Sequence, residues 1–413
     1  MKIILFQNNN PFTTNSAYAN RITALILGLQ KEGAEVVVFM TDGYKTITEK
    51  KQFKKRGNYN GIQYEYLLPI NNTNLWIRRL NTYVLFKFYA FVLKLRITTL
   101  LKNTGMAIIW PTDELNILKS FDRKLKKEEH FYFYEICEYF DIHKISKNNW
   151  IQNSFAEKRM YYFDHHFLPL IDGMAFITNT LYNFYAPKVS ESTRMLILPM
   201  IVDFDRFIPK QNRNYSFDLK KPYIAFTGIM NNEKDGVDIL IESFGEIAEE
   251  FPDLNLYLFG FWHYDTPGHL IQIKSLNLEN RVFYMGTVDR DTIPEIISSA
   301  YLLVLPRPDS HQAQGGFPTK LGEYLATGNP VCATKVGEIP DYLEDEISVF
   351  FAESKSIQSF AASMRKALSS PSKAIEVGKN GQKIARKYFD KNVLSVALFD
   401  FFSEALQNKN HTN

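Results

Sequence analysis

Short apolar runs alternate along the chain with longer segments whose apolar positions repeat every three to four residues. Residues 3–6 form a continuous apolar run, residues 16–31 have helical spacing up to Gly33, and residues 35–40 form a second run. Strands buried on both faces are continuously apolar, whereas a helix with one buried face shows the longer period. This strand–helix–strand order predicts a βαβ unit and therefore a doubly wound α/β fold.

The same order returns in the second half of the chain. A strand at 223–227 leads through Gly228 to a helix at 237–250, and closing helices are expected at 356–368 and 375–388. Further apolar runs predict strands at 254–259, 281–285 and 301–305. Because 413 residues exceed what one ordinary core holds, we expect two such domains.

Composition and charge are those of a globular protein. Hydrophobic residues make up 45% of the chain and charged residues 23%, and a net charge of +3 does not by itself indicate a nucleic-acid partner. Cys137 and Cys332 are the only cysteines, which excludes a disulfide framework and a four-cysteine zinc site. We expect neither a signal peptide nor a transmembrane helix, and a cytoplasmic location.

A glycine-rich loop, closing on Gly315 and Gly316, leads into a helix expected to begin at Pro318. Lys320 lies in the first turn, where the helix dipole opposes a cation, so we expect its replacement to leave the fold intact. Glycines let backbone N–H groups approach a ligand, and a helix N-terminus attracts anions. We interpret this segment as a phosphate or diphosphate site, with Glu323 accepting from nucleotide sugar hydroxyls. The alternative is a surface helix with a solvated Lys320–Glu323 ion pair.

Two further cations follow predicted strands. Lys234 lies in the loop after Gly228, placed to reach a phosphate, and Arg307 follows the strand at 301–305. The first strand lacks the GxGxxG pattern, which argues against a dinucleotide oxidoreductase.

These motifs resemble the retaining nucleotide-sugar glycosyltransferases of the GT-B fold, the large family-4 or group 1 class. The resemblance covers nearly the whole chain and is strongest over residues 222–344. It implies two Rossmann-like doubly wound domains facing a cleft. The implied divisions are an acceptor-side domain at 1–203, a nucleotide-sugar-binding domain at 204–390, and a last segment at 391–413 that returns to the first domain.

The family has two glutamates eight positions apart around the glycine-rich loop, which contact the donor sugar and the ribose. Glu323 matches the second, whereas Gly315 stands at the place of the first. Ile229 replaces a usual arginine, so the resemblance leaves Lys234 and Lys320 to neutralise the leaving diphosphate, together with backbone N–H groups near Gly316.

After the strand at 131–136, where the family commonly has a histidine, this chain has Cys137 with Glu138 beside it. The alternative for Cys137 is a small buried apolar residue. The catalytic residues implied are Lys234, Lys320 and Glu138. The donor-binding residues implied, with the base held at 286–288, are Gly228, Gly286, Thr287, Val288, Arg307, Gly315, Gly316, Phe317, Pro318, Thr319 and Glu323. The acceptor-side residues implied are Asn9, Asn10, Thr14, Asn15 and Cys137, with a polar loop that only caps a helix as the alternative for the first four.

We therefore expect a glycosyltransferase that moves a sugar from a nucleoside-diphosphate sugar to an acceptor hydroxyl with retention, in bacterial polysaccharide or glycolipid synthesis. No cofactor and no metal are expected, because Asp203 and Asp205 form an Asp-x-Asp in the interdomain linker rather than in a nucleotide site. The acceptor is expected to be a saccharide or a lipid-linked saccharide. The alternatives are a nucleotide-sugar epimerase and a non-catalytic nucleotide-sugar-binding relative.

Aromatic and basic residues are interleaved over residues 74–102, supported by the basic run at 50–56. This pattern is typical of a segment that rests on anionic headgroups, so it predicts peripheral contact with the inner face of the membrane. The alternative is an internal helix packed against the sheet.

Overall fold

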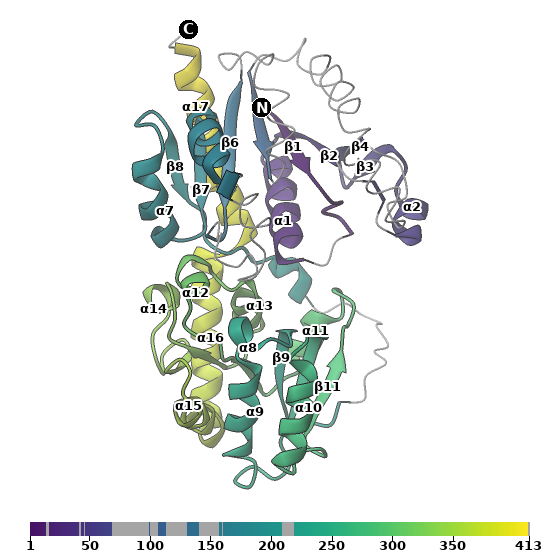
Figure 1. Cartoon of the computed structure of the whole chain (residues 1–413), viewed down its shortest axis with the longest axis vertical. Coiled ribbons are helices and arrows are strands. Elements are labelled where there is room, and N and C mark those ends of the chain that lie inside the picture. The colour runs from purple at the N-terminus through teal and green to yellow at the C-terminus, as the bar shows by residue number, and fades with distance from the viewer. Residues whose placement is uncertain are drawn as a thin grey trace. The chain divides into compact units, whose positions relative to one another are not determined.

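The computed structural model divides the chain into two compact units, drawn in Figure 1. The first comprises Met1–Leu198 with Leu394–Asn413, and the second comprises Pro199–Val393, whereas the sequence places the divisions after residues 203 and 390. The structure describes residues 1–13, 16–40, 43–44, 46–67, 99, 106–112, 130–139, 157–158, 160–208 and 219–411.

The first unit contains a sheet with eight strands among its described residues, in the order β3-β4-β2-β1-β5-β6-β7-β8. Neighbouring strands pair in parallel, except that β3 and β4 are antiparallel. The strands are β1 (Lys2–Gln7), β2 (Glu35–Met40), β3 (Arg56–Tyr59), β4 (Ile62–Tyr66), β5 (Ala107–Pro111), β6 (Phe131–Ile136), β7 (Gly173–Phe176) and β8 (Arg194–Ile197). The helices and short helical turns are α1 (Ala17–Lys31), α2 (Ile47–Gln52), η4 (Phe163–Phe167), η5 (Leu168–Leu170), α7 (Asn179–Tyr185) and η6 (Ala186–Lys188).

Helix α1 shows how the apolar pattern produces this unit. Its first turn is capped by Ser16, whose hydroxyl accepts from the Ala19 N–H at 3.1 Å. The chain turns back after the helix at Gly33, which has a φ of 93°. The apolar stripe of Ile22, Leu25, Ile26 and Leu29 is fully buried. The predicted βαβ unit at the start of the chain is therefore confirmed.

The second unit contains a parallel sheet with the strand order β11-β10-β9-β12-β13-β14. Its strands are β9 (Tyr223–Ile229), β10 (Asn255–Phe261), β11 (Val282–Gly286), β12 (Leu302–Leu305), β13 (Val331–Thr334) and β14 (Phe350–Ala352). Its helices and turns are η7 (Phe204–Phe207), α8 (Asn232–Asp235), α9 (Val237–Gly245), α10 (Thr266–Ser275), α11 (Ile293–Ser298), α12 (His311–Gly315), α13 (Thr319–Thr327), α14 (Ile339–Tyr342), α15 (Ile357–Ser369) and α16 (Pro371–Tyr388). The prediction of two doubly wound α/β domains is confirmed.

The strand order fixes where a ligand site belongs in this second sheet. From β9 the chain builds outward through β10 to β11, and then returns to the other side of β9 with β12. Doubly wound sheets bind ligands outside the carboxyl ends of the strands at such a reversal. The ends of β9 and β12 are therefore the place to look for chemistry.

Helix α17 (Lys391–His411) ends the described chain, and most of it belongs to the first unit. Its Phe402 ring lies 4.8 Å from the ring of Phe133 on β6, edge to face. Among the described residues, no helix combines the length and the apolar character that crossing a membrane requires. The segment at 74–102, for which we predict membrane contact, lies outside the described residues.

Candidate functional site

The carboxyl end of β9 meets the first turn of α13 at a buried ion pair. Lys320 Nζ lies 2.6 Å from Asp235 Oδ1, and the side chains of Lys320 and Asp235 are 18% and 5% exposed. The other carboxylate oxygen of Asp235 accepts from the Ile229 N–H at 3.2 Å. A Cβ on Gly228 would lie 2.2 Å from Lys320 Nζ, so this position must be glycine for the lysine to reach its partner.

Among the charged side chains that act most on Lys320, two are cations and one is a carboxylate. Burial lowers the pKa of Lys320 below its ordinary value; Asp235 opposes this shift, while Arg307 and Lys234 add to it. Lys320 thus has one carboxylate partner, Asp235, and two further cations, Arg307 and Lys234, close enough to act on it. An anion placed there would relieve their repulsion, which is the electrostatic requirement of a phosphate site.

Asp235 is the partner that sequence reasoning missed. It lies between Lys234 and Gly236, and Gly236 takes the left-handed conformation with a φ of 66°. A Cβ on Gly236 would lie 2.1 Å from the Pro306 carbonyl oxygen, so the loop after β9 fits tightly against the segment after β12. One local signal could have identified Asp235: its carboxylate stands between a candidate phosphate-binding lysine and a glycine.

Helix α13 begins after Pro318 as predicted, and Gly328 ends it with a φ of 76°. Its core face of Leu321, Tyr324 and Leu325 is fully buried. The Tyr324 hydroxyl accepts from the Thr227 N–H at 2.7 Å, which fixes the helix to the end of β9. Lys320 is therefore presented from an anchored helix.

The glycine-rich segment before α13 differs from the prediction. Residues His311–Gly315 form helix α12 instead of an open loop, capped by Ser310, whose hydroxyl accepts from the Ala313 N–H at 3.1 Å. The Gly316 N–H donates to the Gln312 carbonyl at 3.0 Å, so it serves this helix rather than a ligand. The expectation that backbone N–H groups near Gly316 take part of the anionic load is thus wrong for Gly316 itself.

Glu323 pairs with Arg206, not with Lys320. Arg206, on η7, directs Nη1 to Glu323 Oε1 and donates from Nη2 to the Arg290 carbonyl at 2.9 Å. This arginine connects α13 with Arg290, which follows the predicted base-binding residues 286–288, and no sequence motif indicates this contact. The alternative of a Lys320–Glu323 ion pair is wrong.

The Asp-x-Asp motif has a structural role in the same unit. Lys391 Nζ lies 2.6 Å from Asp203 Oδ1 and 2.6 Å from Asp205 Oδ2. Within the parts of the chain that the structure describes, no group of three or more histidine, cysteine, aspartate or glutamate side chains is placed to hold a metal ion. The two aspartate carboxylates therefore both pair with the ammonium group of Lys391.

In the first unit, the side chain of Asn10 makes hydrogen bonds to other residues of the fold. Its side-chain amide donates to the Tyr66 hydroxyl at 2.6 Å, and its carbonyl oxygen accepts from the Phe12 N–H at 2.9 Å. Asn9 is partly buried, whereas Thr14 and Asn15 lie outside the described residues. Asn10 therefore shapes the loop after β1, and its predicted contact with an acceptor has no support from these contacts.

Cys137 and Glu138 follow β6 beside a buried ion pair that the sequence did not reveal. Arg21 Nη2 lies 2.7 Å from Glu135 Oε1, with both side chains almost completely buried. Burial and Glu135 raise the pKa of the Cys137 thiol well above its ordinary value, so it stays protonated. Glu138 is exposed to solvent.

Comparison with known proteins shows what this second unit is similar to. Residues 207–384 match the family model described as glycosyl transferases group 1. This part of the chain is similar to group 1 glycosyltransferases. No curated protein matches the sequence.

Solved structures extend the similarity of the fold beyond this part of the chain. Sucrose-phosphate synthase from Thermosynechococcus elongatus is 14% identical with a TM-score of 0.70, over 98% of this chain and 99% of that one. A glycosyltransferase from Rickettsia africae is 16% identical with a TM-score of 0.68, over 98% and 99%. HepE from Anabaena, in complex with UDP and glucose, is 16% identical with a TM-score of 0.66, over 98% and 100%.

Within the second unit, the structure brings together only some of the predicted residues. Gly228 and Asp235 lie against Lys320 at the end of β9, and Lys234 and Arg307 are near enough to act on the Lys320 charge. Glu323 and the segment at 286–290 form a second group through Arg206. The donor-binding roles of Gly315, Phe317, Pro318 and Thr319 stay predictions.

Proposed function

We propose that the protein transfers a sugar from a nucleoside-diphosphate sugar to an acceptor hydroxyl, with retention of anomeric configuration. The observation that carries this proposal is the cation cluster of Lys320, Lys234 and Arg307, in a domain similar to group 1 glycosyltransferases. Of the structures similar in fold, HepE is described in complex with UDP and glucose. A nucleoside diphosphate at the ends of β9 and β12 is therefore the natural ligand to test.

In this proposal, the diphosphate occupies the space beside Lys320, Lys234 and Arg307. The negative charge that develops on the leaving group during transfer is stabilised by cations that are already oriented. Asp235 is a positioning residue, because its contacts with Lys320 and the Ile229 N–H hold the ammonium group at the end of β9. The departing phosphate accepts the acceptor proton, so no carboxylate nucleophile is required.

Glu323 serves the ribose in the same arrangement. Its carboxylate has one oxygen directed to Arg206 and remains 23% exposed, so it can still accept from a sugar hydroxyl. Arg206 fixes the direction of the carboxylate, and through the Arg290 carbonyl it also contacts the segment proposed to meet the base.

A thermal-shift panel of UDP-, GDP-, ADP- and CMP-sugars tests the proposal directly. One of them should raise the melting temperature, because a ligand present at a hundred times its dissociation constant stabilises the fold by about 2.7 kcal/mol. The matching nucleoside diphosphate should compete, and free monosaccharide should not. A panel without any shift would reject the donor assignment.

Turnover assays then separate transfer from the alternatives. Release of nucleoside diphosphate that depends on an added saccharide or lipid-linked saccharide supports transfer, and retention is read from the anomeric configuration of the product. Conversion of the donor without acceptor indicates an epimerase, while binding without turnover indicates a non-catalytic relative, an option favoured by Ile229 and Gly315. Activity should survive EDTA, because the proposed charge stabilisation comes from side chains.

We further propose that the acceptor belongs to bacterial polysaccharide or glycolipid synthesis on the cytoplasmic side of the membrane. The support is the basic and aromatic sequence at 74–102, next to the basic run at 50–56. Co-sedimentation with anionic but not neutral vesicles, weakened by salt and by Arg78→Glu with Arg79→Glu, is the expected result. Equal recovery in the supernatant with both kinds of vesicle would favour a soluble acceptor.

A further inference from the structure

The loop that follows β10 holds aromatic rings out in solvent. Phe261, Trp262 and Tyr264 are 56%, 59% and 73% exposed, although they lie within four consecutive residues. Phe261 pairs in register with Ile229 of β9, which is also exposed. Large apolar side chains gathered at one sheet edge indicate a surface that meets a ligand or a partner.

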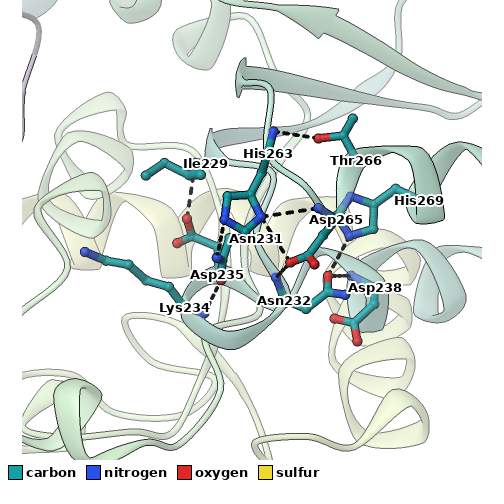
Figure 2. Close-up of polar contacts among 10 residues, drawn as sticks. All are labelled: Ile229, Asn231, Asn232, Lys234, Asp235, Asp238, His263, Asp265, Thr266 and His269. Atoms are coloured by element: carbon teal, nitrogen blue, oxygen red, sulfur yellow. Dashed lines mark hydrogen bonds and ion pairs between the residues drawn. The ribbon is translucent and has the colours of Figure 1, made fainter. Parts of the chain in front are cut away.

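Hydrogen bonds hold this loop in one conformation, as Figure 2 shows around His263. The His263 N–H donates to the Thr266 hydroxyl at 2.9 Å, and the Asn231 side-chain amide lies 3.0 Å from His263 Nε2. The Asn232 N–H donates to Asp265 Oδ2 at 3.0 Å. The loop after β10 is thereby fastened to the loop after β9.

The same network reaches the cation cluster. Asn231 Oδ1 accepts from the Lys234 N–H at 2.7 Å, so one asparagine contacts both the ring-bearing loop and the turn that carries Lys234 (Figure 2). A surface already held in its binding conformation loses little entropy when a ligand arrives. The loop with the exposed rings and the turn that carries Lys234 are thus held together by hydrogen bonds.

Trp262 lies toward the strand end at which we expect the base. Its ring centre is 5.7 Å from that of Tyr284 on β11, in an edge-to-face arrangement. The Tyr284 hydroxyl donates to the Gly260 carbonyl at 3.0 Å, which fixes this contact. Two residues beyond Tyr284, Gly286 has a φ of 71° and open space where a side chain would be.

The distance from the proposed diphosphate site to the expected base site suits a nucleoside. Neighbouring strands are about 4.8 Å apart, so β11 lies roughly 10 Å from β9 across β10. A diphosphate at Lys320 would leave the ribose near Glu323 and carry the base toward Trp262 and Gly286. The Arg206 link between Glu323 and the Arg290 carbonyl supports this direction, because it brings the ribose and base ends together.

We propose that the Trp262 indole is the stacking platform for the nucleobase of the donor. This inference rests on the proposed function and adds the residue that gives the base its affinity. Every nucleobase has a flat π-face that stacks on an aromatic ring. Asp265 and Glu233 raise the pKa of the neighbouring Tyr264, so two carboxylates lie close to these rings, where an uncharged base is better accommodated than an anionic headgroup.

Calorimetry with the wild type and three variants tests the platform. The probes are the nucleoside diphosphate selected by the donor panel and inorganic pyrophosphate, which has no base. Trp262→Ala should weaken nucleoside diphosphate binding by about 5- to 100-fold and leave pyrophosphate affinity unchanged, because stacking on one ring has that range of effect. Trp262→Phe should retain most of the affinity, and Tyr301→Ala, an exposed control just before the start of β12, should match the wild type.

Indole fluorescence gives a second readout. The nucleoside diphosphate should quench the wild type, and this quench should be lost in Trp262→Phe, which keeps the other three of the four tryptophans. Unchanged nucleoside diphosphate affinity in Trp262→Ala would overturn the platform, and so would an equal loss for both probes, which indicates a structural role. Absence of nucleotide binding in the wild type would instead reject the proposed function, and the platform with it.

Discussion

Each unit has a cation–carboxylate pair at the carboxyl end of a strand, and the two pairs differ in what surrounds them. Arg21 and Glu135 in the first unit are 2% and 0% exposed, and Arg21 also donates to the Leu198 carbonyl at 2.6 Å. Burial alone would lower the pKa of Arg21, but Glu135 raises it above the ordinary value. The positive charge of Arg21 is therefore matched by the carboxylate of Glu135 inside the fold.

The Lys320–Asp235 pair of the second unit carries excess positive charge. Burial lowers the pKa of Lys320 more than Asp235 raises it, and Arg307 and Lys234 add smaller effects in the same direction as burial. The comparison teaches that an ion pair alone does not indicate a binding site. What distinguishes the second pair is the extra cations that an anionic ligand would neutralise.

Removing Arg21 should have the largest effect on stability. Arg21→Met leaves the Glu135 carboxylate buried without its counter-charge, which costs about 3–5 kcal/mol. Urea unfolding followed by circular dichroism should show a clearly lower midpoint. The matched control is Arg194→Met, because the Arg194–Glu404 pair is 30% and 65% exposed and should contribute at most about 1 kcal/mol. Equal unfolding midpoints for the two variants would show that the buried pair contributes no more to stability than the exposed pair.

Lys320→Met should affect stability and donor binding together, contrary to the expectation that the fold stays intact. Asp235 would lose the ammonium group paired with its buried carboxylate and keep the Ile229 N–H, which costs about 3 kcal/mol. The double variant Lys320→Met with Asp235→Asn should recover most of this stability but not the donor affinity. Calorimetry with the nucleoside diphosphate separates the two effects, and Lys373→Met, in the exposed pair with Glu346, is the control. Donor affinity regained in the double variant would show that the positive charge is unnecessary.

These partners mark the limit of what the sequence predicts. The strands and helices follow from local apolar periodicity, and the position of Lys320 follows from the start of α13. However, Lys320 meets a residue 85 positions away and Glu323 one 117 positions away, and no local spacing encodes either contact. The error at α12 was local, because two glycines outweighed the Ser310 cap that begins the helix.

Glu323→Gln should give a smaller loss, seen mainly in nucleoside diphosphate binding. The amide keeps the shape of the side chain but removes the charge that strengthens a hydrogen bond to a ribose hydroxyl, a difference of about 1.5–3 kcal/mol. Calorimetry should show weaker nucleoside diphosphate binding and unchanged pyrophosphate binding, because pyrophosphate has no ribose. A loss shared by both ligands would mean that the Arg206–Glu323 pair supports the diphosphate site instead.

The smallest expected effect is a pH dependence that only the second pair should show. Because the pKa of Lys320 is lowered, its ammonium group loses its proton at a lower pH than an ordinary lysine, and pyrophosphate affinity should fall as pH rises through that range. A bound anion favours the charged form, so binding should take up protons, detectable as a buffer-dependent heat in calorimetry. Between pH 7 and 9.5 we expect a loss below tenfold, absent in Lys320→Arg, whose guanidinium stays charged. Equal proton uptake by the wild type and Lys320→Arg would assign the titration to another group. Lys320 would then stay protonated over this pH range, as Arg21 does.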